Sequence, residues 1–201
     1  PHFVRLLKKS GAQVQVICTQ SALQFVTAET LSVVSENPTL VHFFDEKTGM
    51  WNHHVELGIW ADAFIIAPCG SNTLAKMVHG ECDNLLLTTY LSARCPVFIA
   101  PAMDLDMYQQ PAVTENLATL ANRGVIIVDA EEGQLASGLV GKALETRTGG
   151  RRAALGPARN GRDHRRHHGG RLVGRNFFPV LHWQIRVGRH PQGAGASWLH
   201  R

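Results

Sequence analysis

The chain has 201 residues, 44% apolar and 18% charged, a composition typical of a globular protein and incompatible with collagen, a coiled coil or a wholly disordered chain. It contains no apolar run of the roughly 18 residues that a membrane-spanning helix needs, and residues 1–9 lack the apolar core of a signal peptide. The formal net charge is +4, but eleven arginines against a single acid give residues 151–201 a charge of +10, which leaves −6 for residues 1–150.

The first 150 residues alternate between helical and strand patterns. Residues 1–10 have helical spacing and stop at Gly11, residues 14–17 predict a strand, and residues 22–34 predict a helix that either Thr19 or Ser21 caps. Further short apolar runs predict strands at residues 40–44, 63–67, 97–100 and 125–128. This alternation predicts an α/β fold, a three-layer Rossmann-like (flavodoxin-like) parallel sheet with helices on both faces.

Two predicted strands end in Ala-Pro turns that are rich in small residues. The first turn is residues 67–73 (APCGSNT) and the second is residues 100–104 (APAMD). In a parallel sheet, ligands bind at the carboxyl ends of the strands, so these turns suit an anionic cofactor held at helix N-termini. Taken alone, the same pattern also describes a capped loop.

The cysteines indicate a reducing compartment. None of the four has the C-x-x-C spacing of a metal site, so we expect free thiols, no metal and a cytoplasmic location. They are Cys18, Cys69, Cys82 and Cys95.

Several separate motifs together resemble a known family. They are His54-Val55-Glu56-Leu57 with Trp60-Ala61-Asp62, Asn72-Thr73-Leu74-Ala75-Lys76, Asp83-Asn84-Leu85-Leu86, Pro101-Ala102-Met103-Asp104 with Met107-Tyr108, and residues 133–141. In order and spacing they resemble the phosphopantothenoylcysteine decarboxylases, which are flavin-containing cysteine decarboxylases. In many bacteria this family forms the front half of a fusion with phosphopantothenate-cysteine ligase. The resemblance covers roughly residues 4–141.

The resemblance implies a trimeric α/β flavoprotein that binds FMN near its subunit boundaries. Its small-molecule substrate would be 4′-phosphopantothenoylcysteine, which loses CO₂ to give 4′-phosphopantetheine in coenzyme A biosynthesis. Oxidation of the thiol to a thioaldehyde by FMN would provide the electron sink, and the flavin would later reduce the enethiol. Neither nucleic acid nor a membrane is expected as a partner.

The resemblance also assigns site residues. His54 would act as an acid or base, or order the substrate thiol. The alternative is that His54 and the adjacent His53 are simply two surface histidines. The turn Pro101, Ala102 and Met103 would hold the substrate carboxylate. The residues that would contact FMN or the substrate are Thr19, Ser21, Asn72, Thr73, Thr88 and Thr89.

Two positions depart from the family pattern. The family most often has Asn after the P-x-M turn, whereas ionised Asp104 is only an acceptor, so Asp104 is either protonated or directed elsewhere. Some members share the D-x-D-M-Y sequence, and Asp104 is kept as a catalytic and substrate-binding candidate. Ser137 stands where the family has a flap cysteine, and a hydroxyl is a far weaker acid than a thiol of pKa about 8.5. Ser137 is a catalytic candidate by position.

The two ends of the chain also depart from the family. Residues 1–145 are expected to form the decarboxylase domain without its first strand and phosphate loop, which predicts poor stability and weak FMN retention. Residues 146–201 form a basic tail that we expect to be disordered. A frameshift near residues 142–150 would explain the tail, because reading residues 167–170 one base later permits Ile-Thr-Ala-Gly, an echo of the opening of the ligase.

Three alternative functions remain. A decarboxylase of C-terminal peptidyl cysteine is disfavoured by the P-A-M turn with the flap glycines, and a non-catalytic regulatory subunit of the same fold is disfavoured by His54. A nucleic-acid binder would depend on the tail, in which aromatic residues do not interleave with the charges.

Overall fold

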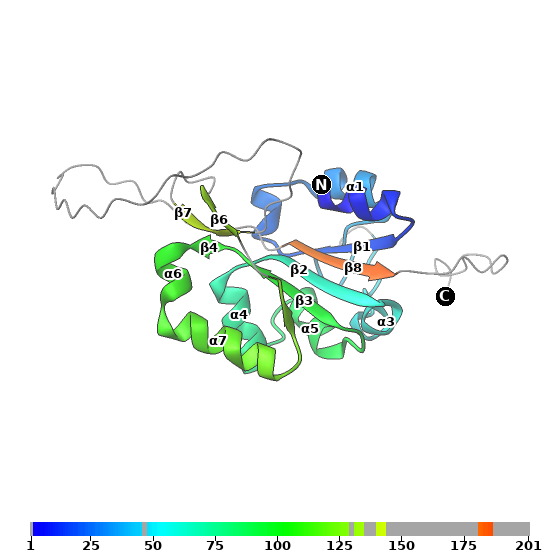
Figure 1. Ribbon diagram of the computed structural model, residues 1–201. Coiled ribbons are helices and arrows are strands. Elements are labelled where there is room, and N and C mark those ends of the chain that lie inside the picture. The colour runs from blue at the N-terminus through cyan, green and yellow to red at the C-terminus, as the bar shows by residue number, and fades with distance from the viewer. Residues whose placement is uncertain (1, 46–47, 129–130, 135–139, 144–180, 187–201) are drawn as a thin grey trace.

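The computed structural model describes residues 2–45, 48–128, 131–134, 140–143 and 181–186 (Figure 1). The helices are α1 (His2–Lys9), the short 3₁₀ turn η1 (Ala22–Gln24), α2 (Ala28–Ser35), α3 (His54–Trp60), α4 (Ser71–His79), α5 (Leu85–Ser92), α6 (Leu105–Gln109) and α7 (Pro111–Asn122). The strands are β1 (Gln13–Cys18), β2 (Ala63–Cys69), β3 (Val97–Pro101), β4 (Met103–Asp104), β5 (Ile126–Ile127), β6 (Glu131–Gln134), β7 (Val140–Ala143) and β8 (Leu181–Arg186).

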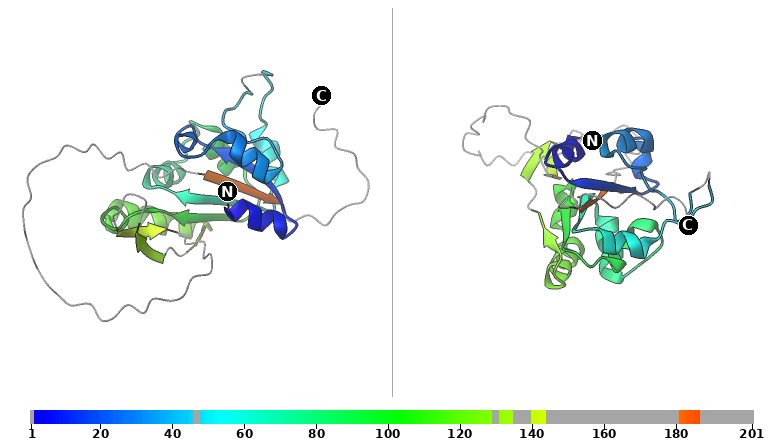
Figure 2. Two further views of the ribbon diagram at one scale, coloured as in Figure 1. Left: turned by 90° about the horizontal axis from the view of Figure 1, so that it is seen from above. Right: turned by 90° about the vertical axis from the view of Figure 1, so that its right-hand side faces the viewer.

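The main sheet has five strands in the order β1-β8-β2-β3-β5. Strands β2, β3 and β5 run parallel, as the sequence predicts. Helices α1 and α2 cover one face of the sheet, and α3, α4, α5 and α7 cover the other (Figures 1 and 2). The three-layer α/β prediction is therefore confirmed. Within the described part of the chain, no helix combines the length and the apolar character needed to cross a membrane.

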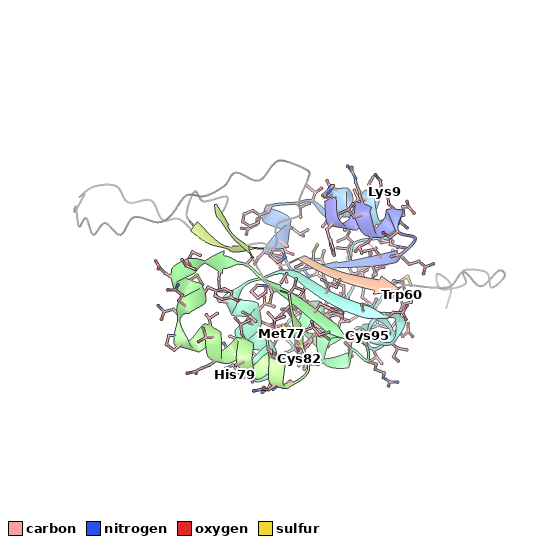
Figure 3. All side chains as sticks on the ribbon, in the orientation of Figure 1. Lys9, Trp60, Met77, His79, Cys82 and Cys95 are labelled. Atoms are coloured by element: carbon pink, nitrogen blue, oxygen red, sulfur yellow. The ribbon has the colours of Figure 1, made fainter. Side chains whose placement is uncertain are left out.

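Each face of the sheet has its own hydrophobic core. On the α1 and α2 side, Val14 and Val16 of β1 pack with Val4 and Leu31, all fully buried. On the other side the fully buried side chains come from β2, β3 and the helices beneath them: Phe64, Ile66, Leu74, Met77, Leu86, Ile99 and Leu120. Met77 is labelled in Figure 3. This two-sided burial explains why the strands read as nearly continuous apolar runs.

The basic tail contributes a strand, which differs from the expected disorder of residues 146–201. Strand β8 lies between β1 and β2 and is antiparallel to both, with Trp183 opposite Val16 and Ile65. Without it, the facing edges of β1 and β2 would present unpaired N–H and C=O groups. The sequence of β8, LHWQIR, alternates apolar and polar residues, a strand signal that the tail's charge obscured. Residues 144–180 and 187–201 lie outside the described part of the chain.

The predicted strand at residues 40–44 is reduced to a single bridge. Leu40 pairs with Ile17, accepting a hydrogen bond from the N–H of Cys18 at 2.8 Å and donating one to the carbonyl of Val16 at 3.0 Å. Beyond Leu40 the chain leaves the sheet and folds back on itself, so that Phe44 instead pairs with Trp51. Local turn formation prevails here over the apolar pattern.

The predicted helix at residues 22–34 is broken into η1 and α2. Thr27 is extended, with ψ 150°, and its Oγ1 accepts a hydrogen bond from the N–H of Thr30 at 3.2 Å, which starts α2 afresh. Of the two expected caps, Thr19 accepts a hydrogen bond from the N–H of Ala22 at 3.3 Å, whereas Ser21 makes no side-chain cap bond.

A proline placed in β8 tests whether the tail belongs to the sheet. We expect Gln184→Pro to lower the free energy of unfolding by about 3 kcal/mol, because a central strand has partners on both sides and proline removes a ladder donor. Gln184→Ala, the matched control, keeps the ladder donor and should lower the free energy of unfolding by much less. Urea unfolding measures both variants, and equal stability of the two would remove β8 from the sheet.

Candidate functional site

A pocket of about 480 Å³ lies at the carboxyl ends of β1, β2 and β3. Its walls come from the loop after β1, the start of α4, the α4–α5 connection and the turn after β3. The lining residues are Thr19, Gln20, Ser21, Gly70, Ser71, Asn72, Thr73, Lys76, Asp83, Asn84, Ala102, Met103 and Met107.

The pairing of β2 with β3 brings two of these walls together. Cys69 lies opposite Pro101 in the ladder, and the N–H of Ala102 donates to the carbonyl of Cys69 at 3.1 Å. The Ala67–Pro68 peptide bond just before this point is cis. Both Ala-Pro turns therefore leave the sheet side by side, as the sequence predicts for parallel strands.

The first turn of α4 offers backbone donors to the pocket. Helix α4 begins at Ser71, and its N-cap, Gly70, has no side chain to accept from the first amides. These amides and the positive end of the helix dipole lie where Gly70, Asn72 and Thr73 line the pocket. Such a helix start is suited to an anionic group, above all a phosphate.

Lys76 supplies a positive charge to the lining, and two acids pair with it. Its Nζ hydrogen-bonds to Asp83 and lies 3.7 Å from a carboxylate oxygen of Glu81. The hydrogen bond to Asp83, followed by the charges of Asp83 and Glu81, raises the pKa of Lys76 and keeps it protonated. Asp83 also accepts from Nδ2 of Asn84 at 2.8 Å, and Asn84 caps α5 by accepting from the N–H of Leu87 at 3.0 Å.

Sequence reasoning placed Lys76, Asp83 and Asn84 inside family motifs without giving them a role in the site. One local signal was available, because Asn84 directly before three leucines has the pattern of a helix N-cap.

Most of the residues expected to contact FMN or substrate do line one pocket. These are Thr19, Ser21, Asn72, Thr73, Ala102 and Met103. Pro101 ends β3, directly before them.

Thr88 and Thr89 lie in α5 and line neither of the two cavities at this edge of the sheet. Thr89 is fully buried, and its Oγ1 donates to the carbonyl of Leu85 at 2.6 Å. Thr88 donates to the carbonyl oxygens of Cys82 at 3.2 Å and Asn84 at 3.0 Å. Both hydroxyls are thus used by backbone carbonyls at the start of α5, and a contact with the flavin ring stays a prediction.

His54 begins α3 and does not line the pocket. Its Nδ1 is buried and has no hydrogen-bond partner among the described residues. Its ring meets Phe43 edge-on, with 6.4 Å between ring centroids. Phe43 lines a second cavity of about 190 Å³, which shares Thr19 and Asn84 with the larger pocket. An unpartnered buried nitrogen is unusual and requires an explanation.

Asp104 caps a helix and belongs to a strand that pairs with β7. Oδ1 of Asp104 accepts a hydrogen bond from the N–H of Met107 at 2.8 Å and caps α6. Strand β4 pairs with β7 of the β6–β7 hairpin, with Asp104 opposite Gly141. The hairpin therefore flanks the P-A-M turn. Ser137 lies outside the described residues.

All four cysteines are free. Burial raises the pKa of Cys18 to about 12, and it raises the pKa of Cys69 still further. Cys95, which is half-buried, also has a raised pKa, mainly because of desolvation. Cys82 is exposed; Figure 3 labels it and Cys95 below the sheet. Cys69 follows the first Ala-Pro turn, but its buried, protonated thiol is unsuited to act as a nucleophile.

Known proteins resemble this chain in sequence and in fold. The family model described as Flavoprotein matches residues 1–148. A cysteine/cysteine sulfinic acid decarboxylase from an unknown prokaryotic organism is 56% identical over 117 residues, which are 58% of this chain and 33% of that protein. The coenzyme A biosynthesis bifunctional protein CoaBC of Bacillus subtilis is 40% identical over 136 residues, 68% of this chain and 34% of that protein. This chain thus spans about a third of the length of these relatives.

Two solved structures share the fold and part of the sequence. The FMN-dependent cysteine decarboxylase SpaF has a TM-score of 0.53 and 35% identity, covering 61% of this chain and 69% of its own. A PPC decarboxylase mutant complexed with pantothenoylaminoethenethiol has a TM-score of 0.58 and 27% identity, covering 70% of this chain and 80% of its own.

The burial of the thiols predicts an order of alkylation at about pH 8, because only a thiolate reacts. We expect iodoacetamide to modify Cys82 first and Cys95 more slowly, and to modify Cys18 and Cys69 only after unfolding. Peptide mass spectrometry after timed quenching measures each site, with the urea-unfolded chain as the control in which all four react. Modification of Cys69 in the folded chain as fast as Cys82 would contradict the structure at the base of the first Ala-Pro turn.

Proposed function

We propose that this chain, which belongs to the Flavoprotein family, catalyses the FMN-dependent decarboxylation of 4′-phosphopantothenoylcysteine to 4′-phosphopantetheine in coenzyme A biosynthesis. The proposal rests on one observation: the strand-end turns, the uncapped start of α4 and the P-A-M turn all line the same pocket. The similarity to CoaBC and to a PPC decarboxylase bound to a pantothenoyl compound supports this substrate. A cytoplasmic location stays a prediction.

The residues present fit FMN. The uncapped amides of α4 suit its phosphate, and the pocket volume of about 480 Å³ falls in the range of ligand sites. Thr19, Ser21, Asn72 and Thr73 would hold the cofactor through hydroxyl and amide groups. Bound FMN would supply the two-electron oxidation of the substrate CH₂–SH group to a thioaldehyde, the electron sink for CO₂ loss, and the later return of those electrons.

His54 would move a proton during this reaction or order the substrate thiol. Its Nδ1 is unpartnered among the described residues, and the contact with Phe43 restrains the ring. An imidazole can both donate and accept a proton, which suits it to general acid–base work. Ser137 stays a catalytic candidate by position, and Pro101 to Met103 would position the substrate.

We further propose that copies of this chain associate as a trimer through the face around His54. Val55 and Ile59 lie one turn apart on α3 and are 47% and 53% exposed. Phe44 and Trp51, 53% and 41% exposed, lie on the segment that precedes α3, with 4.5 Å between their ring centroids. Large exposed apolar patches mark interaction sites. Association here would cover the surface and shield the proton-moving group from water.

A second candidate substrate is free cysteine. It is favoured by the 56% identity to a cysteine/cysteine sulfinic acid decarboxylase. Peptidyl cysteine remains a third candidate from the sequence analysis, and SpaF, which shares the fold, is an FMN-dependent cysteine decarboxylase. All three substrates contain the same CH₂–SH and carboxylate groups and differ only in what is attached to the nitrogen. The same chemistry therefore serves each of them.

Loss of the imidazole tests the role of His54. In the chain loaded with FMN, we expect His54→Asn to lower kcat for CO₂ release from phosphopantothenoylcysteine by about 100-fold, because removing a general acid or base typically costs that much. Visible absorbance should show unchanged FMN binding. His53→Asn is the matched control, since His53 makes no side-chain cap bond. Equal turnover of both variants would end the assignment, and a chain that takes up no FMN would end the proposed function.

A charge placed on the α3 surface tests the trimer. We expect Val55→Glu with Ile59→Glu to convert the protein to monomers, because burying carboxylates at an interface is costly. Val33→Glu is the control, since Val33 is 76% exposed on α2, across the sheet. Light scattering after gel filtration gives the mass. If the wild-type chain, the Val55→Glu/Ile59→Glu variant and Val33→Glu all have the same mass, association through this face is ruled out.

A further inference from the structure

Gly58 is the point at which α3 packs against the end of α5. It is buried, whereas Val55 and Ile59 on the same helix are exposed. A Cβ added at Gly58 would lie 2.5 Å from the carbonyl oxygen of Ser92 and 2.7 Å from its carbonyl carbon, well inside the separation of packed atoms. Both atoms belong to the backbone, so neither can rotate away as a side chain would. The two helices approach this closely because residue 58 has no side chain.

A hydrogen bond holds the same approach. The N–H of Arg94, just after α5, donates to the carbonyl of Gly58 at 3.2 Å. The backbone of Ala93, the C-cap of α5, is extended, with ψ 132°, so α5 has ended before this bond forms. Helix α3 is therefore joined to the end of α5 both by close packing and by a backbone hydrogen bond.

Helix α5 connects this contact to the cavities. Its N-cap, Asn84, lines both the larger pocket and the smaller cavity, and its last residue, Ser92, meets Gly58. On α3, His54 lies one helical turn before Gly58 and on the same face. Its ring meets Phe43 of the smaller cavity edge-on, with 6.4 Å between ring centroids. The separation of α3 from α5 therefore sets where the imidazole lies relative to the cavity walls.

We propose that Gly58 is a positioning residue for His54: its missing side chain lets α3 lie against α5 and so places the imidazole for the proton movement assigned to it. This inference rests on the proposed function, because it deepens the role of His54 in that reaction. Gly58 acts through the helix that carries His54, without a contact of its own with the reacting atoms. To accommodate a Cβ, α3 would have to move by about 1 Å, and a misplacement of that size can lower a rate about 100-fold.

The variant Gly58→Ala adds one methyl group at this contact. Alanine is the better helix former, so a loss comes from the clash and not from the helix propensity of α3. In the chain loaded with FMN, we expect kcat for CO₂ release from phosphopantothenoylcysteine to fall about tenfold, since a shift of α5 would relieve part of the clash. The affinity for FMN should stay unchanged, because no residue of α3, which the structure describes in full, lines the larger pocket. An unchanged kcat overturns the proposal.

Gly124→Ala is the matched control. Gly124 has a φ of 87°, which alanine adopts only with strain, yet a Cβ there meets nothing within 4 Å among the described residues. It follows α7, apart from α3 (Figure 1). This variant should lose stability without losing turnover. Equal losses of kcat in the two variants overturn the proposal, as does a loss of FMN affinity in Gly58→Ala that matches its loss of turnover.

The position of the imidazole can also be measured without substrate or FMN. The NMR signal of the His54 Cε1–H is assigned by its absence from His54→Asn, and the ring current of Phe43 makes this signal sensitive to the distance between the two rings. We expect the signal to shift in Gly58→Ala and to stay in place in Gly124→Ala. If the wild-type chain releases no CO₂ from phosphopantothenoylcysteine, the proposed function fails and this measurement alone decides the role of Gly58. A His54 signal that Gly58→Ala does not shift overturns the proposal.

Arg94→Pro tests the same contact should Gly58→Ala fail to fold. It removes the N–H that donates to Gly58, and Ala93 already has the extended backbone that proline favours in the residue before it. No atom is added to α3. We expect the same two changes, a lower kcat in the FMN-loaded chain and a shifted His54 signal. A wild-type value of either one overturns the proposal.

Discussion

The parallel pairing of β2 with β3 is the interaction on which the pocket depends. Its ladder runs from Phe64 opposite Val97 to Cys69 opposite Pro101, and it continues into the bond between the N–H of Ala102 and the carbonyl of Cys69. Both strands have packed or partly buried side chains on the two faces of the sheet, so a slip in register would displace side chains on two sides at once. The position of the α4 start relative to the P-A-M turn is therefore fixed by the core, and the functional loops need little rigidity of their own.

The need to satisfy backbone groups explains the unusual strand β8. The sheet places β1 and β2 one strand apart, and the facing edges require a partner. A segment more than a hundred residues away in sequence takes this position in antiparallel direction, opposite β1 on one side and β2 on the other. Any strand of suitable length satisfies the ladder, because backbone hydrogen bonding is largely indifferent to sequence. The pocket is built by the other strands, at their carboxyl ends.

The sequence predicted the parts of this molecule in which local pattern and tertiary environment agree. The strands around Val16, Ile66 and Ile99 and the gathering of Asn72 with Met103 follow from apolar runs and from parallel topology. The predicted single helix at residues 22–34 was wrong because the cap at Thr27 starts a second helix. The predicted disorder of the tail was wrong where β8 joined the sheet. Lys76 and Asp83 lie seven residues apart, and nothing in their spacing showed that the turn at Gly80 would bring them into contact. Cofactor contacts at Thr88 were inferred from family resemblance alone. Resemblance assigns a position in the sequence, but it does not predict the direction in which the side chain points.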